Sequence, residues 1–211
     1  MFSRAVWGAR ASIQVGLFAT MLALLVAVPL GLLAGYYRGW LDSVIARATD
    51  VLLAFPFLIL AIGLAAIIGP SLGTVTIALG VAAIPGMLRV ARGETLALRE
   101  ADFVPAAVAS GAGDASIIFR HILPNISGPL IVMATLTIPR TIIGEATLSY
   151  LGLGIQRPES SWGVMLRDAQ AYYYSTPRLA VFPGLAIVLA ALAFNLLGDG
   201  LRDVLDPLTA R

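Results

Sequence analysis

The 211-residue sequence contains no cysteine, no lysine and a single histidine. Without cysteine, the chain forms no disulfide and offers no thiolate as a nucleophile or metal ligand. Without lysine, it has no phosphate-binding loop of the G-x-x-x-x-G-K-[ST] type, which excludes ATP hydrolysis by that route. The lone histidine, His121, has no second histidine or carboxylate at helical spacing. The sequence therefore predicts no metal site, no cofactor in this chain and no enzyme.

Charged residues are also scarce. They make up 12% of the chain, whereas 59% of the residues are hydrophobic and the mean hydropathy is +0.90. A soluble domain carries about twice that charged fraction, so the composition indicates an integral membrane protein. The formal net charge of +2 is too small to indicate nucleic-acid binding.

Long apolar intervals separate the few ionisable residues. Roughly 20 such residues cross the hydrocarbon core as a helix, and no β-barrel alternation is present. Gly69-Pro70-Ser71 divides the longest interval into two crossings. We therefore predict an all-α, polytopic fold in which residues 1–211 form one domain. Its expected spans are 11–37, 51–69, 71–88, 126–151 and 179–198.

The positive-inside rule sets the expected orientation. Placing 89–125 in the cytoplasm and 152–178 outside puts more arginines on the inner side. The inner ones are Arg38, Arg47, Arg89, Arg92, Arg99, Arg120, Arg202 and Arg211, and the outer ones are Arg4, Arg10, Arg157, Arg167 and Arg178. The N-terminus then lies outside, which leads us to expect one more helix upstream of this sequence. The all-arginine usage suggests a GC-rich genome and hence a bacterial plasma membrane.

Two ionisable residues, Arg140 and Glu145, interrupt the fourth expected span. Such groups are costly in a bilayer and usually face a partner or an aqueous cavity. Five residues of α-helix place them roughly 140° apart, which disfavours a mutual salt bridge. Either each one pairs with a neighbouring helix, or both line a path for a polar solute.

The outer segment 152–178 contains the aromatic run Tyr172-Tyr173-Tyr174. Aromatic residues often anchor a chain at the membrane interface. The alternative is a helix or loop that contacts an external partner or covers the path.

The inner segment contains two short predicted helices. Pro105 suits a first helical turn, and Gly111 suits the left-handed residue that ends a helix. Asp114 is then expected to cap a second helix, 115–122, which stops before Pro124. Such an elbow could lie in a groove of another protein or rest on lipid headgroups.

The elbow also contains alanine, glycine and leucine-proline positions at the spacing of a known sequence signature. Ala106-Ala107, Gly111 and Leu123-Pro124 resemble the E-A-A, G and I-x-L-P signature of importer-type ABC permeases. The whole chain is similar to the dipeptide/oligopeptide/nickel permease family, and its last block is similar to the second, C-type subunit. The blocks that carry this resemblance are Asp50 to Pro56, Arg120 to Asn125, Glu145 to Gly154, Ser161-Trp162-Gly163 and Asn195 to Asp203.

Two positions depart from the signature. Pro105 stands in place of its glutamate, and His121 in place of its isoleucine, so docking through that glutamate is not expected. The resemblance assigns an ATPase-coupling role to a set of elbow residues, whereas Arg140 and Glu145 are a candidate translocation path because of their charge within a span. The elbow set is Pro105, Ala106, Ala107, Gly111, Asp114, Arg120, His121, Leu123 and Pro124.

The resemblance further implies a type I importer permease fold and a heterodimer with a related permease. Two cytoplasmic ATPase subunits would bind ATP and Mg²⁺, and an external solute-binding protein would deliver peptides. The cargo could instead be nickel, glutathione or another polar solute. A gradient-driven carrier would need an ion-coupling site that only Arg140 and Glu145 could supply, and a membrane-embedded enzyme would need a nucleophile with a base.

Overall fold

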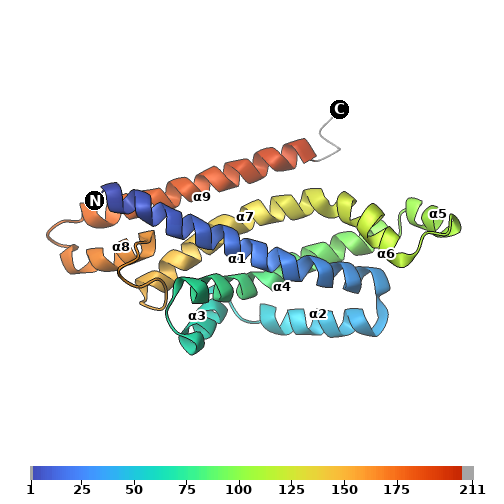
Figure 1. The fold of residues 1–211 in the computed structure, drawn as a ribbon, viewed down its shortest axis with the longest axis horizontal. Helices are drawn as coiled ribbons and strands as arrows, with labels where there is room; N and C mark the ends of the chain where they lie inside the picture. Colours follow the sequence, from blue (N-terminus) through green and yellow to red (C-terminus); the bar gives the residue numbers. More distant parts are fainter. Residues whose placement is uncertain (1, 206–211) are drawn as a thin grey trace.

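The computed structural model describes residues 2–205, which form helices joined by short turns (Figure 1). In chain order these are α1 (Phe2–Tyr37), α2 (Gly39–Leu53), α3 (Phe57–Ile68), α4 (Leu72–Arg99), α5 (Phe103–Ala109), α6 (Asp114–Ser116), the π-helical η1 (Ile117–Ile122), α7 (Leu123–Tyr150), α8 (Trp162–Ala169), the 3₁₀ turn η2 (Gln170–Tyr172) and α9 (Arg178–Leu205).

The long helices α1, α4, α7 and α9 run along the length of the molecule (Figure 1). The short helices gather at its two extremes: α5 and α6 lie at one, which we call the elbow end, and α8 lies at the other, which we call the α8 end. Of these helices, α1 and α7 connect the two ends, whereas α9 ends short of α5 and α6 (Figure 1).

Small residues allow α1 and α4 to pack closely. Every fourth residue of α1 is small and buried along the stripe Ala19, Ala23, Ala27, Gly31 and Gly35. A Cβ on Gly31 would lie 2.6 Å from the Cβ of Ala91, and one on Gly35 would lie 2.6 Å from the Cβ of Thr95. Close backbone approach of this kind is typical of helix pairs in membranes.

The structure differs from the expected 51–69 span. The helix breaks after Leu53, and α2 and α3 meet at 89°. The break precedes Pro56, which disfavours helical geometry at the residue before it. Two ion pairs hold α2 against α4: Arg92 binds both carboxylate oxygens of Asp42, with the second contact at 2.7 Å, and Arg89 lies 3.2 Å from Asp50. The apolar interval did not reveal this bend because its composition is continuous across it.

The break at residues 69–71 lies where the sequence placed it. Gly69 ends α3 with φ of 101°, a conformation that favours glycine. Ser71 caps α4, and its hydroxyl accepts a hydrogen bond of 3.0 Å from the Thr74 amide.

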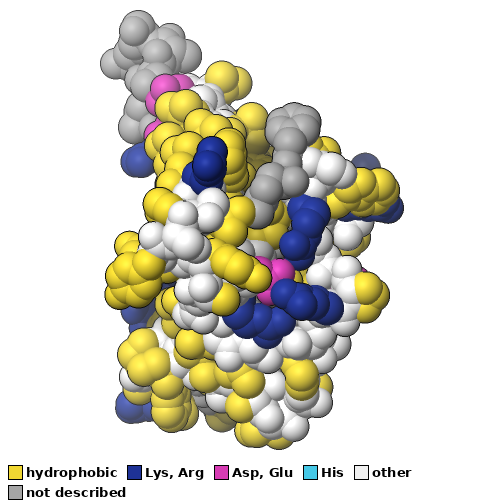
Figure 2. Space-filling model, turned by 90° about the vertical axis from the view of Figure 1, so that its left-hand side faces the viewer, with side chains coloured by type: hydrophobic (Ala, Val, Ile, Leu, Met, Phe, Trp, Pro, Cys, Tyr) yellow, Lys and Arg dark blue, Asp and Glu magenta, His cyan; other side chains and the backbone are white. Residues whose placement is uncertain are grey.

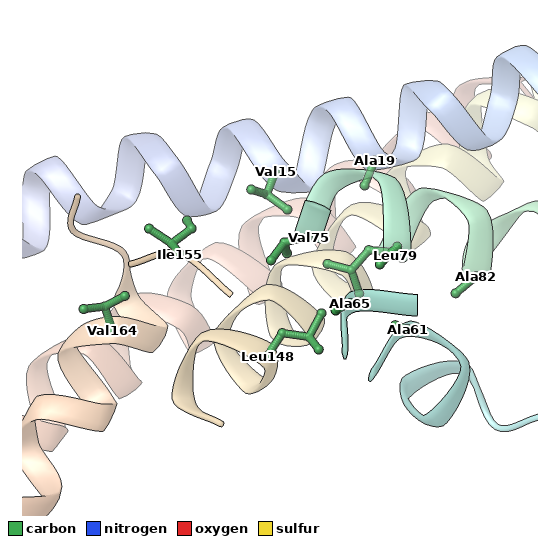
Figure 3. Close-up of a cluster of buried hydrophobic side chains, with 11 residues drawn as sticks. Val15, Ala19, Ala61, Ala65, Val75, Leu79, Ala82, Leu148, Ile155 and Val164 are labelled. Atoms are coloured by element: carbon green, nitrogen blue, oxygen red, sulfur yellow. The ribbon is translucent and has the colours of Figure 1, made fainter. Parts of the chain in front are cut away.

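A buried cluster joins α1, α3, α4 and α7 near the α8 end (Figure 3). Val15, Val75 and Leu148 have no exposed surface there. The cluster also contains Ile155 and Val164 from the segment that follows α7, so that segment is part of the packed structure.

Within residues 2–205, four helices are long and apolar enough to cross a membrane, and the bent α2–α3 pair makes a fifth if it counts as one span. The all-α, polytopic fold is therefore confirmed. The helices extend beyond the spans expected at 11–37, 71–88, 126–151 and 179–198. Arg211, assigned above to the inner side, lies outside the described residues.

Candidate functional site: the elbow and the polar residues of α7

The first half of the elbow is a helix with a defined C-terminal cap. Gly111 follows α5 with φ of +83°, which confirms the predicted left-handed glycine. The Ala112 amide donates to the Ala107 carbonyl at 3.0 Å, and the Gly111 amide donates to the Val108 carbonyl at 2.9 Å. These paired bonds form a Schellman motif, which fixes the direction in which the chain leaves α5.

The second half corrects two predictions. The helix does not stop before Pro124: α6 continues through η1 directly into α7. The wider π turn ends just before the proline, whose ring would clash with the carbonyl four residues back in a regular helix. Asp114 is the first helical residue rather than a cap; Gly113 precedes it, and no side-chain cap bond forms.

Asp114 instead ties the elbow to α1. The Tyr36 hydroxyl donates to the Asp114 carboxylate at 2.9 Å, and the Arg99 guanidinium lies 5.7 Å from the centre of the Tyr36 ring. The rings of Phe103 and His121 lie 6.5 Å apart, so His121 packs between the two halves of the elbow.

An apolar cluster also fixes the inner face of the elbow. Val104, Ile117 and Ile118 are buried together with Leu32 of α1 and Ala91 of α4. Ala107 and Leu123 pack against the same cluster. The elbow is thus attached to α1, α4 and α7, and displacement of one would strain the others.

The outer face of the elbow consists of small and apolar residues. Pro105, Ala106, Val108 and Phe119 are exposed, with Arg120 beside them. Val108 is 56% exposed and Phe119 is 65% exposed. This surface is flat on the α5 side, because alanine and proline carry short side chains.

Arg140 opens onto a cavity of about 210 Å³ beside the bend between α2 and α3. Its guanidinium lies over the ring of Phe57, 4.1 Å from the centre. The cavity is otherwise lined by Leu52, Leu53, Phe55, Pro56, Ala82, Ala83, Gly86, Met133 and Thr137. A second cavity of about 650 Å³ lies between α4, α7 and α9 towards the elbow end, and Met133 lines both.

Glu145 lies in a different environment and has no exposed surface. Its carboxylate accepts hydrogen bonds of 2.7 Å from the hydroxyls of Ser12 in α1 and Ser149 in α7. Ser161, before α8, also hydrogen-bonds to it. We call these three residues the serine cage. The structure therefore does not bring Arg140 and Glu145 together, and Glu145 lines neither of the two cavities described above.

The serine cage is linked onward to the segment after α7. The Ser12 hydroxyl accepts from the Trp162 amide at 3.3 Å, and the Ser149 hydroxyl accepts from the Ile155 amide at 3.0 Å. The chain also passes close to α7: a Cβ on Gly163 would lie 2.5 Å from the Ala146 carbonyl oxygen. Glu145 is thus the centre of the contacts that hold α8 against the helices.

The surface of the α8 end carries a cluster of arginines around an acidic group (Figure 2). Asp168 pairs with Arg4 at 3.1 Å and with Arg157 at 2.7 Å. Burial raises the pKa of the Asp168 carboxyl, but the hydrogen bonds and charges of Arg157 and Arg4 outweigh it, and the net pKa lies below its ordinary value. The exposed Tyr172, Tyr173 and Tyr174 follow on the same segment.

Sequence reasoning missed Ser12, Ser149 and Ser161 as partners of Glu145. Ser149 stands four residues after Glu145, and that helical spacing was a usable signal. Ser12 is 133 residues away in sequence, so no local pattern indicates the contact. The stripe of small residues in α1 was also detectable, because its members are spaced four residues apart in the sequence.

Bundled spanning helices, a rigid elbow at one end and a charged residue facing an internal cavity define a helical membrane permease. Residues 27–211 match the profile of the binding-protein-dependent transport system inner membrane component family. The chain belongs to this family. It is accordingly a multi-pass inner-membrane permease subunit of an ABC importer and is not itself catalytic.

Relatives of established name support this membership. The chain is 48% identical over 207 residues to the dipeptide transport system permease protein DppC of Alkalihalophilus pseudofirmus, an alignment that covers 98% of this chain and 68% of the relative. It is 46% identical over 207 residues to the glutathione transport system permease protein GsiD of Pectobacterium atrosepticum, with 98% and 69% covered.

Solved structures share the fold at low sequence identity. An inward-facing structure of the MetNI methionine ABC transporter superimposes with a TM-score of 0.80 at 18% identity, covering 98% of both chains. An amino acid ABC transporter gives a TM-score of 0.67 at 15% identity, covering 96% of this chain and 92% of the other. The importer permease fold expected from the sequence is therefore confirmed.

Proposed function

We propose that this chain is the C-type permease subunit of an ATP-driven peptide importer. The relatives named for dipeptide and glutathione transport support the cargo class, because both are small peptides with free carboxylates. In this proposal the chain pairs with a second, homologous permease, with two ATPase subunits and with an external solute-binding protein. ATP and Mg²⁺ are held by the ATPase subunits.

The observation that carries the proposal is the attachment of the elbow. Its outer face is exposed and largely apolar, whereas its inner face is tied into α1, α4 and α7. A partner that grips the outer face therefore moves the long helices with it. We assign this coupling role to Pro105, Ala106, Ala107, Gly111, Asp114, Arg120, His121, Leu123 and Pro124.

The proposal also fixes the orientation. The elbow, within 89–125, faces the cytoplasm, and the segment 152–178 faces outward, where the binding protein delivers cargo. Closure of the ATPase subunits draws the elbows of the two permeases together and opens the central path outward, and hydrolysis reverses the change. Arg140 lines this path, whereas Glu145 maintains the helix packing beside it.

Substitution of one alanine tests the docking role. Ala106→Asp places a charge on the outer face of α5, which would have to be desolvated on docking. We expect the tagged chain to lose its ATPase subunits during purification while the second permease remains bound. The matched control is Ala171→Asp, which places the same charge on an exposed residue of η2 at the α8 end.

The control chain should retain the ATPase subunits. If Ala106→Asp also retained them, with ATP-dependent peptide uptake unchanged, the elbow would not be the docking surface. Uptake that persists after the ATPase genes are deleted would favour a gradient-driven carrier instead.

A further inference from the structure

Within residues 2–205, Arg140 is a cation without a counter-ion. Among residues 2–205 no ion pair or hydrogen bond to its side chain is present, and its recorded contact is the ring of Phe57. The nearest carboxylate along α7 belongs to Glu145, which is enclosed by the serine cage. The opposite charge that Arg140 requires is therefore not supplied within this part of the chain.

The position of Arg140 makes that requirement strong. It lies ten residues before the end of α7, or about 15 Å along the helix, well inside a membrane-spanning segment. An arginine at such depth is costly unless it meets an anion or water, so intramembrane arginines usually mark a functional site.

The cavity beside Arg140 is shaped for one charged group. Arg140 is the only charged residue among those that line it. The one lining hydroxyl, on Thr137, already donates to the Met133 carbonyl at 2.7 Å. The remaining wall is apolar, and a site of low polarity strengthens the attraction between a guanidinium and an oxyanion.

The guanidinium packs against the ring of Phe57, with its central carbon 4.1 Å from the ring centre. A guanidinium placed over a ring keeps its N–H donors, which lie in its own plane, free to bind a planar oxyanion with two parallel bonds. Phe57 is the first residue of α3, directly after the bend at Pro56. The bend therefore positions the ring that positions Arg140.

We infer that the cavity between Arg140 and the α2–α3 bend binds the terminal carboxylate of the transported peptide. This inference rests on the proposed function, because it names the cargo group that the path recognises. The cavity volume of about 210 Å³ is below the range of about 300–1,000 Å³ typical of whole-ligand pockets. It therefore takes the charged end of a peptide while the rest of the cargo lies outside it.

Met133 lines both this site and the larger cavity towards the elbow end. Its side chain is flexible and unbranched, so it can adjust as cargo passes between the two cavities. Release towards the elbow end also requires the carboxylate to leave Arg140.

The test compares a peptide with its C-terminal amide. The complete transporter, with its partner subunits, is reconstituted in vesicles, and uptake of the two peptides is measured with saturating binding protein. For wild type and Arg140→Gln, the ratio of acid to amide uptake is compared, so that discrimination by the binding protein cancels. We expect Arg140→Gln to lower this ratio about tenfold, the effect of losing a hydrogen-bonded charge.

Two further variants sharpen the result. Arg140→Lys keeps the charge without the planar fork, so it should restore part of the ratio. Arg10→Gln is the control, because Arg10 is an exposed arginine near the start of α1 and away from the cavity. Its ratio of acid to amide uptake should equal that of wild type. An unchanged ratio in Arg140→Gln, with uptake preserved, would overturn the inference and leave the proposed function standing. No ATP-dependent uptake of either peptide by wild type would instead count against the proposed function.

Other sources of the anion give distinct outcomes. An anionic lipid headgroup would make the Arg140→Gln defect equal for acid and amide, and the defect would disappear in vesicles of phosphatidylcholine alone, whose headgroup has no net charge. A carboxylate of the second permease would make the variant lose that subunit during purification. Either result overturns the inference.

If the binding protein rejects the amide altogether, binding is measured directly. A peptide labelled with ¹³C at its carboxylate is added to the detergent-solubilised permease pair, and its NMR line should broaden with wild type and sharpen with Arg140→Gln. Equal broadening with both proteins rejects the site.

Discussion

At the scale of single residues, Glu145 and Arg140 are two charged residues of one helix with very different surroundings. Glu145 is enclosed by hydroxyls from α1, from α7 and from the turn before α8. Arg140 lies one and a half turns away and faces a cavity. The two side chains therefore differ in role. The Glu145 carboxylate holds α1, α7 and the turn before α8 together, whereas the Arg140 guanidinium faces a cavity that a ligand could enter.

Replacing Glu145 tests its structural role. Glu145→Ala leaves the hydroxyls of Ser12 and Ser149 buried without this acceptor, and each unpaired group costs about 1–3 kcal/mol. We expect the thermal midpoint of the purified protein to fall by roughly 4 °C or more. Glu145→Gln should lose less, because its amide oxygen still accepts from one serine. The control is Glu159→Ala, an exposed glutamate, which should leave the midpoint unchanged.

The pairing of Asp168 predicts a pH dependence. Its folded pKa lies below the ordinary value of 3.8, so its contribution to stability is present above that value and is lost as the pH falls through the folded pKa. Asp168→Asn should therefore lower the thermal midpoint equally at pH 7 and pH 5, and the difference from wild type should shrink below about pH 4. Because Arg4 and Arg157 are half or more exposed, the effect should stay below about 1 kcal/mol. A difference that disappears already between pH 7 and pH 5 would contradict this pairing.

Local sequence predicts some of these residues and not others. The cost of a charge inside an apolar span was enough to single out Arg140 and Glu145. Their partners could not be predicted, because Ser12 meets Glu145, and the Trp162 amide meets Ser12, only after α1 and α8 have packed on α7. An isolated serine in an apolar run gives no signal of that meeting.

At the scale of elements, the elbow depends on one backbone conformation. Gly111 has φ of +83°, whereas the nearby Gly113 has φ of −77°, and a Cβ added to either would meet no atom within 4 Å. The pair therefore separates backbone strain from steric contact.

Gly111→Ala should impair coupling, and Gly113→Ala should not. Alanine in the left-handed region costs about 1–2 kcal/mol, which disturbs the Schellman motif and the direction of the chain after α5. We expect the ATPase activity of the assembled transporter to become less responsive to the loaded binding protein in Gly111→Ala. Equal responses in both variants would show that the turn is not under this constraint.

The elements themselves were predictable in part. The break at Gly69 and the turn at Gly111 follow from glycine chemistry that acts locally. The bend between α2 and α3 has a local signal in Pro56, but its 89° angle and the continuation of η1 into α7 were not predictable. Pro56 and Pro124 carry similar local signals, yet one helix ends and the other widens into a π turn, because the packing of Ile117 and Ile122 against α1 and α4 keeps the second path helical.

At the scale of the whole molecule, the elbow and α8 lie at opposite ends, so they should be reached from opposite sides of the membrane (Figure 1). The absence of cysteine makes this directly testable. In intact cells Tyr174→Cys should react with a membrane-impermeant maleimide, because Tyr174 is 99% exposed in the outer segment. In cells that lack the ATPase subunits, which would otherwise cover the elbow, Val108→Cys should react only after the membrane is opened. Labelling of Val108→Cys in intact cells would reverse the orientation.

The whole arrangement was predictable in outline. Composition indicated a membrane bundle, which the structure confirms, whereas the orientation indicated by the arginine distribution stays a prediction. The mutual positions of the helices could not be derived in the same way, because α9 and α1 are both apolar almost all round. Only the small stripe on α1 identifies a packing face, and α9 has no comparable stripe against α7 beyond Gly198, where a Cβ would lie 2.8 Å from the Thr135 hydroxyl oxygen.

The uninterrupted helix from Asp114 to Tyr150 has a thermodynamic consequence. Its 37 residues extend about 55 Å, and no loop along that length absorbs a displacement. A displacement of the helix at the elbow end is therefore transmitted to the α8 end. If nucleotide binding at the ATPase subunits weakens the binding of the delivery protein by some factor, arrival of that protein must weaken nucleotide binding by the same factor. The continuous helix thus couples the two binding equilibria.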